Sequence, residues 1–166
     1  MDVLWAPWRM KYVRYVAVKR PRGCFICEAA ERGVGEDTLV LFKGTYGIVQ
    51  MNLYPYNTGH LLVSPIRHVA SLSDLTREEG LALMSLVTTS IEALNRALSP
   101  HGFNVGLNLG RVAGAGLEGH VHFHIVPRWE GDTNFMPVVA GTKVIPEALV
   151  DTYRRLAKYA DLISEE

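Results

Sequence analysis

The stretch His120-Val-His-Phe-His-Ile-Val126 does most to decide the fold. Polar and apolar residues alternate along it, and a period of two is typical of a strand with two different faces. One face would carry His120, His122 and His124. The other face would carry Val121, Phe123 and Ile125. We therefore predict that the apolar face packs against helices and that the histidine face borders a cleft.

Three interpretations of this histidine face compete. A solvated polar face needs no function, but chance seldom places three histidines in register. Alternate histidines on a strand can also converge on a metal ion. In the third interpretation one imidazole is a nucleophile, while its neighbours fix its tautomer and supply charge for a phosphate. Six glycines between residues 102 and 119 favour phosphate chemistry, because glycine-rich backbone can turn its N–H groups toward anionic oxygens.

The rest of the chain supplies further strands and helices. A capping box, Thr76-Arg-Glu-Glu79, begins the best helix, and shorter helices are expected near residues 28–33 and from Pro146 onward, with an apolar stripe over Leu149–Ile163. Because short turns join most of the strands, the sequence predicts an α+β fold in which helices pack on an antiparallel sheet. The additional strands are expected at Thr38–Phe42, Gly47–Met51, His60–Pro65 and Phe103–Leu109.

Composition restricts the class of protein. The chain has 166 residues, of which 48% are hydrophobic and 20% charged, so disorder and coiled coil are poor interpretations. Seventeen basic residues balance seventeen acidic ones, which argues against a general affinity for nucleic acid or an anionic membrane. No apolar run has the length of a membrane span or of a signal peptide. We therefore expect a cytoplasmic protein with neither nucleic-acid nor membrane partners.

Two signatures of this sequence resemble the histidine-triad family. The stretch His120–Val126 fits the pattern His-φ-His-φ-His-φ-φ, in which φ is apolar. Upstream, Asn52-Leu-Tyr-Pro-Tyr-Asn-Thr-Gly-His-Leu-Leu-Val-Ser-Pro-Ile-Arg-His68 is similar to the second signature, in which Gly-His precedes a strand that ends in Pro-x-x-His. The likeness extends from about Cys24 to Trp129. The segments Leu4–Met10 and Gly131–Pro137 resemble a longer prokaryotic branch that contains diadenosine tetraphosphate phosphorylases.

The resemblance implies nucleotidyl transfer at an α-phosphate. The middle histidine of the family attacks phosphorus, so His122 would become a covalent nucleotidyl-histidine, and His124 would contact the phosphate. Asn52 matches the position that binds ribose, and Asn108 matches an amide position near the α-phosphate. Where the family often has Ser, Thr or Gln a few residues before the triad, this chain has Gly116, Leu117 and Glu118 and one extra residue. Backbone N–H groups, Gly116 among them, would substitute for those side chains at the leaving group. Water or inorganic phosphate would then release the nucleotide.

The cysteine pair Cys24-x-x-Cys27 has several interpretations. A disulfide is disfavoured in a cytoplasmic chain, a thioredoxin-like pair would need a βαβ pattern, and two buried free thiols remain an alternative. Relatives with this pair bind zinc through both cysteines, the Pro-x-x-His histidine and the first triad histidine. The resemblance therefore implies a closed structural zinc site made of Cys24, Cys27, His68 and His120. His60 is expected to be structural, with a hydrogen bond near the sheet.

We divide the chain into a basic aromatic arm (1–22), a histidine-triad domain (23–130) and a C-terminal extension whose helix packs on the domain (131–166). The arm would pack on the domain or a partner subunit, or would attract a polyphosphate. The resemblance also implies a homodimer with a continuous sheet.

The predicted function is phosphorolysis of dinucleoside polyphosphates such as diadenosine tetraphosphate, with adenine nucleotides and inorganic phosphate as partners. The alternatives are hydrolysis of the same substrates, hydrolysis of nucleoside phosphoramidates or acyl-adenylates, and nucleotide binding with little turnover.

Overall fold

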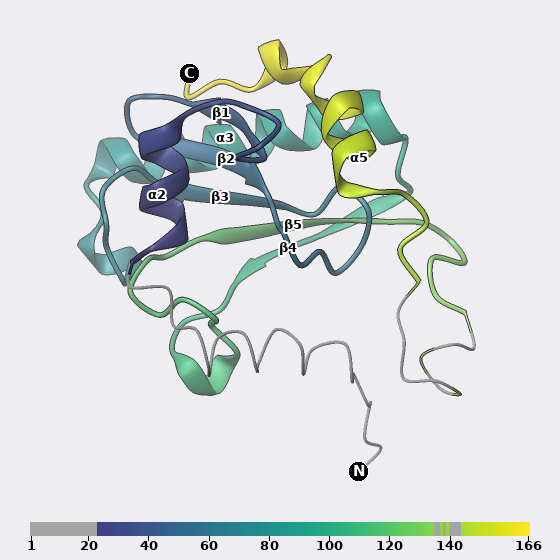
Figure 1. The fold of residues 1–166 in the computed structure, drawn as a ribbon. Coiled ribbons are helices and arrows are strands. Elements are labelled where there is room, and N and C mark those ends of the chain that lie inside the picture. The colour runs from purple at the N-terminus through teal and green to yellow at the C-terminus, as the bar shows by residue number, and fades with distance from the viewer. Residues whose placement is uncertain (1–22, 135–136, 138, 140–143) are drawn as a thin grey trace.

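The computed structural model describes residues 23–134, 137, 139 and 144–166. The arm expected at residues 1–22 and part of the segment 131–143 lie outside the described residues. A five-stranded antiparallel sheet in the order β1-β2-β3-β5-β4 forms the centre of the structure (Figure 1). The strands are β1 (Val40–Lys43), β2 (Gly47–Met51), β3 (Leu61–Pro65), β4 (Gly102–Leu107) and β5 (Phe123–Arg128).

Helices cover both faces of the β1-β2 side of this sheet. The helices are α2 (Phe25–Arg32), α3 (Arg77–Leu98) and α5 (Leu149–Ala157). Ile48 of β2 packs with Ile26 of α2, whereas its neighbour Val49 points to the opposite face and packs with α3. Both faces of β2 and β3 are therefore buried, and every residue of these two strands is buried. The predicted α+β fold with helices on an antiparallel sheet is confirmed.

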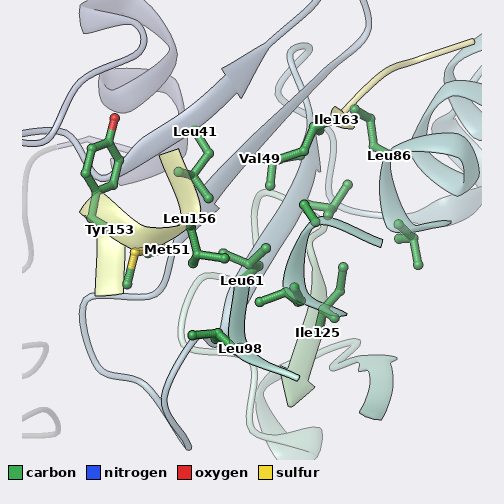
Figure 2. Close-up of a cluster of buried hydrophobic side chains, with 14 of the residues drawn as sticks. Leu41, Val49, Met51, Leu61, Leu86, Leu98, Ile125, Tyr153, Leu156 and Ile163 are labelled. Atoms are coloured by element: carbon green, nitrogen blue, oxygen red, sulfur yellow. The ribbon is translucent and has the colours of Figure 1, made fainter. Parts of the chain in front are cut away.

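The larger hydrophobic core lies between the sheet and α3 and extends to α5 (Figure 2). It joins side chains from β1, β2, β3 and β5 to helix residues such as Leu86 and Leu156, which are at most 1% exposed. Tyr153 of α5 donates its hydroxyl to the carbonyl of Val40 at 3.0 Å, so the C-terminal helix is fixed to β1. This core supports the far side of β5 and thereby fixes the direction of His124, the histidine within that strand.

The capping box predicted at the start of α3 is present. Thr76 Oγ1 accepts the N–H of Glu79 at 3.2 Å, and the Glu79 carboxylate accepts the N–H of Thr76 at 2.8 Å. Arg67 donates to both carboxylate oxygens of Glu79, at 2.8 and 2.7 Å. The start of α3 is therefore tied to the segment that follows β3, the segment that carries His68.

The predicted start of β5 is wrong by three residues. β5 begins at Phe123 rather than His120. Continued pairing would set Val121 opposite Pro65, which has no N–H to donate, and the Pro65 carbonyl instead accepts the His120 side chain at 2.8 Å.

The C-terminal helix also begins later than predicted. It starts at Leu149 rather than Pro146 and ends at Ala157, so Ala160 belongs to a separate 3₁₀ turn (Ala160–Leu162). Glu147 lies before the helix, where its carboxylate accepts the Thr152 hydroxyl at 2.8 Å.

None of the helices in the described ranges combines the length and the apolar composition that a membrane crossing requires.

Candidate catalytic and metal site

The histidine face of β5 is the face turned toward α2. Ile125 is 0% exposed in the core under α3, so His124 and Val126 on either side of it point the opposite way. Register sets His124 opposite Leu62 of β3 and Gly106 of β4. The predicted separation of an apolar face from a histidine face is therefore present, although only the last of the three histidines lies within the strand.

The backbone fixes the tautomer of His122. Its Nδ1 lies 2.8 Å from the carbonyl oxygen of His120, and a carbonyl can only accept, so Nδ1 carries the proton. The other ring nitrogen, Nε2, then presents a lone pair. The ring is 7% exposed and has the Phe25 ring of α2 edge-on at 6.4 Å and the His124 ring at 5.0 Å. A neutral imidazole with an available Nε2 is a nucleophile.

A second chain of hydrogen bonds fixes His124. The backbone N–H of Tyr56 donates to His60 Nδ1 at 3.0 Å, so the proton of neutral His60 is on Nε2. That Nε2 lies 2.9 Å from His124 Nδ1, which must accept. His124 therefore carries its own proton on Nε2, and this buried nitrogen has no hydrogen-bond partner in the part of the chain that the structure describes. It is an N–H donor available to an anionic oxygen.

Burial keeps these imidazoles neutral. Burial, with a smaller contribution from the nearby His124, lowers the pKa of His60 to about 3. Burial, with a contribution from His122, lowers the pKa of His124 to about 4. The pKa of His122 is also lowered by burial, and its hydrogen bond to the His120 carbonyl opposes that shift. At neutral pH the cluster therefore holds one lone pair and one N–H donor without a charge on any ring.

These lowered pKa values predict a loss of stability in acid. His60 titrates near pH 6.5 when unfolded and near 3 when folded, so between these values the unfolded chain binds more protons. The free energy of unfolding should therefore decrease as pH falls from 6.5 toward 3. Thermal unfolding measured from pH 7 to 4 should show this decrease, and it should be smaller for His60→Gln.

The matched control for that measurement is His101→Gln, because His101 is exposed in the turn before β4. This variant should keep the pH dependence of the parent. An NMR titration that finds His60 protonated in the folded protein near pH 6 would contradict the prediction, whatever the stability of the variants.

The four predicted zinc ligands lie together. One ligand atom from each of Cys24, Cys27, His68 and His120 falls within 4.8 Å of all the others. His120 Nδ1 is 3.2 Å from Cys24 Sγ, and His68 Nδ1 is 3.3 Å from Cys27 Sγ. These residues come from the start of α2, the segment after β3 and the segment before β5. Both cysteines are free thiols, so the cluster contains no disulfide.

The donor set fits a tetrahedral zinc ion. Two thiols and two imidazoles are typical ligands of a closed structural site. His120 donates Nε2–H to the Pro65 carbonyl at 2.8 Å, which leaves Nδ1 deprotonated toward the thiols, as metal-binding histidines require. Partial burial and the neighbouring Cys24 thiol raise the pKa of Cys27 to about 11. A cation would therefore have to displace thiol protons, as metals do at such sites.

The three residues predicted to contact the nucleotide lie after β2, after β4 and in the loop before His120. Asn52 follows β2, accepts the Tyr54 N–H at 2.9 Å, and places its Nδ2 3.3 Å from His60 Nδ1. Asn108 follows β4 two residues after Gly106, the partner of His124. Gly116 is exposed in the loop before His120. The roles of these three residues in nucleotide binding remain predictions.

His60 and Tyr56 have no catalytic position predicted from the sequence, yet both contact His124. His60 has the hydrogen bonds expected of a structural residue, but one of its partners is His124. The Tyr56 ring also stacks on His124, with centroids 5.7 Å apart and an interplanar angle of 19°. The Gly-His signature was the available signal, because it places a histidine immediately before β3, next to the strand that carries His124.

The fold and the paired histidine clusters define a histidine-triad protein. The chain belongs to the HIT family, since residues 34–131 match the model of the HIT domain. It is 45% identical over 159 residues to the AP-4-A phosphorylase of Mycobacterium tuberculosis, covering 93% of this chain and 82% of that protein.

Two further comparisons agree with this family. An adenosine 5'-monophosphoramidase of Schizosaccharomyces pombe is 29% identical over 63% of this chain and 74% of its own length. The crystal structure of a hypothetical histidine triad nucleotide-binding protein from Sulfolobus tokodaii superposes with a TM-score of 0.66 at 25% identity. The superposition covers 84% of this chain and 91% of the Sulfolobus tokodaii chain.

Proposed function

We propose that this chain is a diadenosine tetraphosphate phosphorylase that transfers an adenylyl group through His122. One observation carries the chemistry: Nδ1–H of His122 is bound to the His120 carbonyl, so Nε2 presents its lone pair beside the His124 ring. The choice of substrate is supported by the AP-4-A phosphorylase that is 45% identical over 93% of this chain.

The proposed reaction has two steps that balance. In the first, His122 Nε2 forms a bond to the α-phosphorus, the bond from that phosphorus to the bridging oxygen breaks, and ATP leaves. In the second, an oxygen of inorganic phosphate attacks the same phosphorus, the N–P bond breaks and ADP leaves, with one proton passing to solvent. His124 Nε2–H donates to a non-bridging oxygen, where charge accumulates in both transition states.

The products with and without inorganic phosphate test this proposal. With diadenosine tetraphosphate and phosphate we expect equimolar ADP and ATP, at a rate that rises with phosphate until saturation. Without phosphate the covalent intermediate should accumulate, and AMP should form only slowly. Chromatography of the nucleotides measures the amounts of ADP, ATP and AMP with and without phosphate. AMP formation at a rate independent of phosphate would instead identify a hydrolase.

The monophosphoramidase relative favours a second candidate, hydrolysis of adenosine 5'-phosphoramidate. The first step is similar, because His122 would attack the same phosphorus. The P–N bond of the substrate would break and ammonia would leave with a proton taken from solvent, and water would then release AMP. Turnover of the phosphoramidate that exceeds turnover of diadenosine tetraphosphate would favour this candidate. A nucleotide-binding protein without turnover would form no adenylyl-histidine with either substrate.

We also propose that Cys24, Cys27, His68 and His120 bind one zinc ion per chain. Their donor atoms and the Pro65 hydrogen bond fit that ion. Zinc in a closed site with four protein ligands supplies structural cross-linking rather than an open coordination position.

The sequence composition further favours a cytoplasmic location.

A homodimer with a continuous sheet is the assembly that we propose. In the described part of the chain β4 pairs only with β5, so its other edge presents unpaired backbone groups. Val105 on this strand is 46% exposed. Unprotected edges of this kind pair readily with another strand. Light scattering should give twice the mass of the chain, and a monomer mass would contradict this assembly.

A further inference from the structure

A cavity lies on the histidine face at the C-terminal end of β5, beyond His124. Val126 is the next residue on that face and pairs with Asn104 of β4, so both lie about 7 Å beyond His124 along the strand. The cavity is open to solvent, has a volume of about 260 Å³ and is lined by Tyr56, Asn57, Asn104, Val126 and Arg128. Sites that enclose a whole drug-sized ligand have about 300–1,000 Å³, so this cavity has room for one part of a dinucleotide.

Hydrogen bonds among the lining residues and Asp132 hold the polar wall of the cavity in place. Arg128 donates through Nε and Nη2 to the Asp132 carboxylate, at 2.6 and 3.0 Å, and through Nη1 to Asn104 Oδ1 at 2.7 Å. Asn57 Nδ2 donates to the same carboxylate and to the Pro127 carbonyl, both at 3.0 Å. The Asp132 side chain is only 6% exposed. The guanidinium and the two amides are therefore fixed before any ligand binds.

The chemistry of this wall suits a nucleobase better than a phosphate. Asp132 compensates the charge of Arg128, so the pair leaves little net charge for an anion. Of the five guanidinium N–H groups, three are used by bonds to other described residues and two remain for a ligand. Tyr56 is 44% exposed, and its ring can stack on a base. The guanidinium and the amides beside the ring can form hydrogen bonds with the edge of that base.

We propose that this cavity binds the base of the leaving nucleoside, the half of the dinucleoside polyphosphate that is not transferred to His122. This inference rests on the proposed function, because it requires a substrate with two nucleosides. The position agrees with it, since Tyr56, which lines the cavity, stacks on His124, and the cavity lies beyond His124 along β5 as seen from His122. The polyphosphate would run past the N–H of His124 on its way from the attacked phosphorus to the second base.

The test compares two nucleotides that differ only by the second adenosine. In a His122→Asn background, calorimetry should give a Kd for diadenosine tetraphosphate roughly tenfold below that for adenosine 5'-tetraphosphate, the effect expected of one stacked base. Asn104→Ala and Arg128→Lys should each raise the first Kd about three- to tenfold, because each removes a hydrogen bond that shapes the wall. The Kd for adenosine 5'-tetraphosphate should stay within twofold.

Matched controls lie on the exposed surface of α3, on the far side of the sheet. Asn95→Ala and Arg96→Lys should change neither Kd, and light scattering should show the same assembly for all variants. Equal affinity for the two nucleotides in the parent, or an equal loss of both in the wall variants, would overturn this subsite. Lack of turnover by the unmodified protein would instead overturn the proposed function, and the binding comparison still decides about the cavity.

Discussion

His122→Asn is expected to lower turnover of diadenosine tetraphosphate by at least about 10⁴-fold, the scale seen when a covalent nucleophile is removed. The asparagine amide can still donate to the His120 carbonyl, which His122 Nδ1 contacts at 2.8 Å, so the local backbone should be preserved. No lone pair of imidazole strength would then face the phosphorus. The Kd for the nucleotide should stay within a few-fold of the parent, because His124 and the surrounding backbone remain.

Two measurements separate chemistry from binding in this variant. Intact-mass spectrometry after rapid quenching should show an adenylyl adduct on the parent without phosphate and none on His122→Asn. His101→Asn is the matched control, since this histidine is exposed outside the cluster. It should keep both the adduct and the rate. A His122→Asn protein that retains a tenth of the parent activity would exclude His122 as the nucleophile.

Sequence periodicity predicted the face on which the histidines lie but not where the strand begins. The alternation of residues 120–126 sufficed because the apolar face of β5 must enter the core, and Ile125 is 0% exposed there. The start of β5 depends on a different strand, since Pro65 of β3 cannot donate to a neighbour. The start of β5 can therefore be predicted only when its pairing with β3 is known.

The tautomers of the cluster could not be predicted from residue types. His60 and His124 are ordered by the backbone N–H of Tyr56, a main-chain group that any residue other than proline would supply. The sequence indicates that histidines are present at these positions, whereas the loop geometry decides which nitrogen holds each proton. The zinc ligands could be predicted from the family resemblance, because that prediction needs only the residue types at matching positions and not the geometry of a loop.

One residue connects the two clusters. The His120 side chain places Nδ1 3.2 Å from Cys24 Sγ, while its backbone carbonyl accepts the proton-bearing nitrogen of His122 at 2.8 Å. Cys24 also precedes α2, which carries the Phe25 ring beside His122. Constraint of the cysteine-histidine cluster is therefore transmitted to His122, the proposed nucleophile, through His120 and α2.

Removal of zinc is accordingly expected to destabilise the protein strongly. Protein purified without chelator should contain close to one zinc per chain. At a free zinc concentration of about 1,000 times the Kd, binding contributes about 4 kcal/mol to the free energy of unfolding. At about 2–4 °C per kcal/mol for a chain of this size, chelation should lower the Tm by about 8–16 °C.

The double variant Cys24→Ser, Cys27→Ser should show a similar loss without chelator, because hydroxyls are poor zinc ligands and His68 and His120 alone do not close the site. His101→Ala is the control that should retain both zinc and Tm, since this histidine lies outside the cluster. Elemental analysis and calorimetry measure the two quantities independently. A zinc content near zero in active, chelator-free protein would show that the four side chains pack as free thiols and imidazoles, and that the order around His122 comes from the sheet and α2 alone.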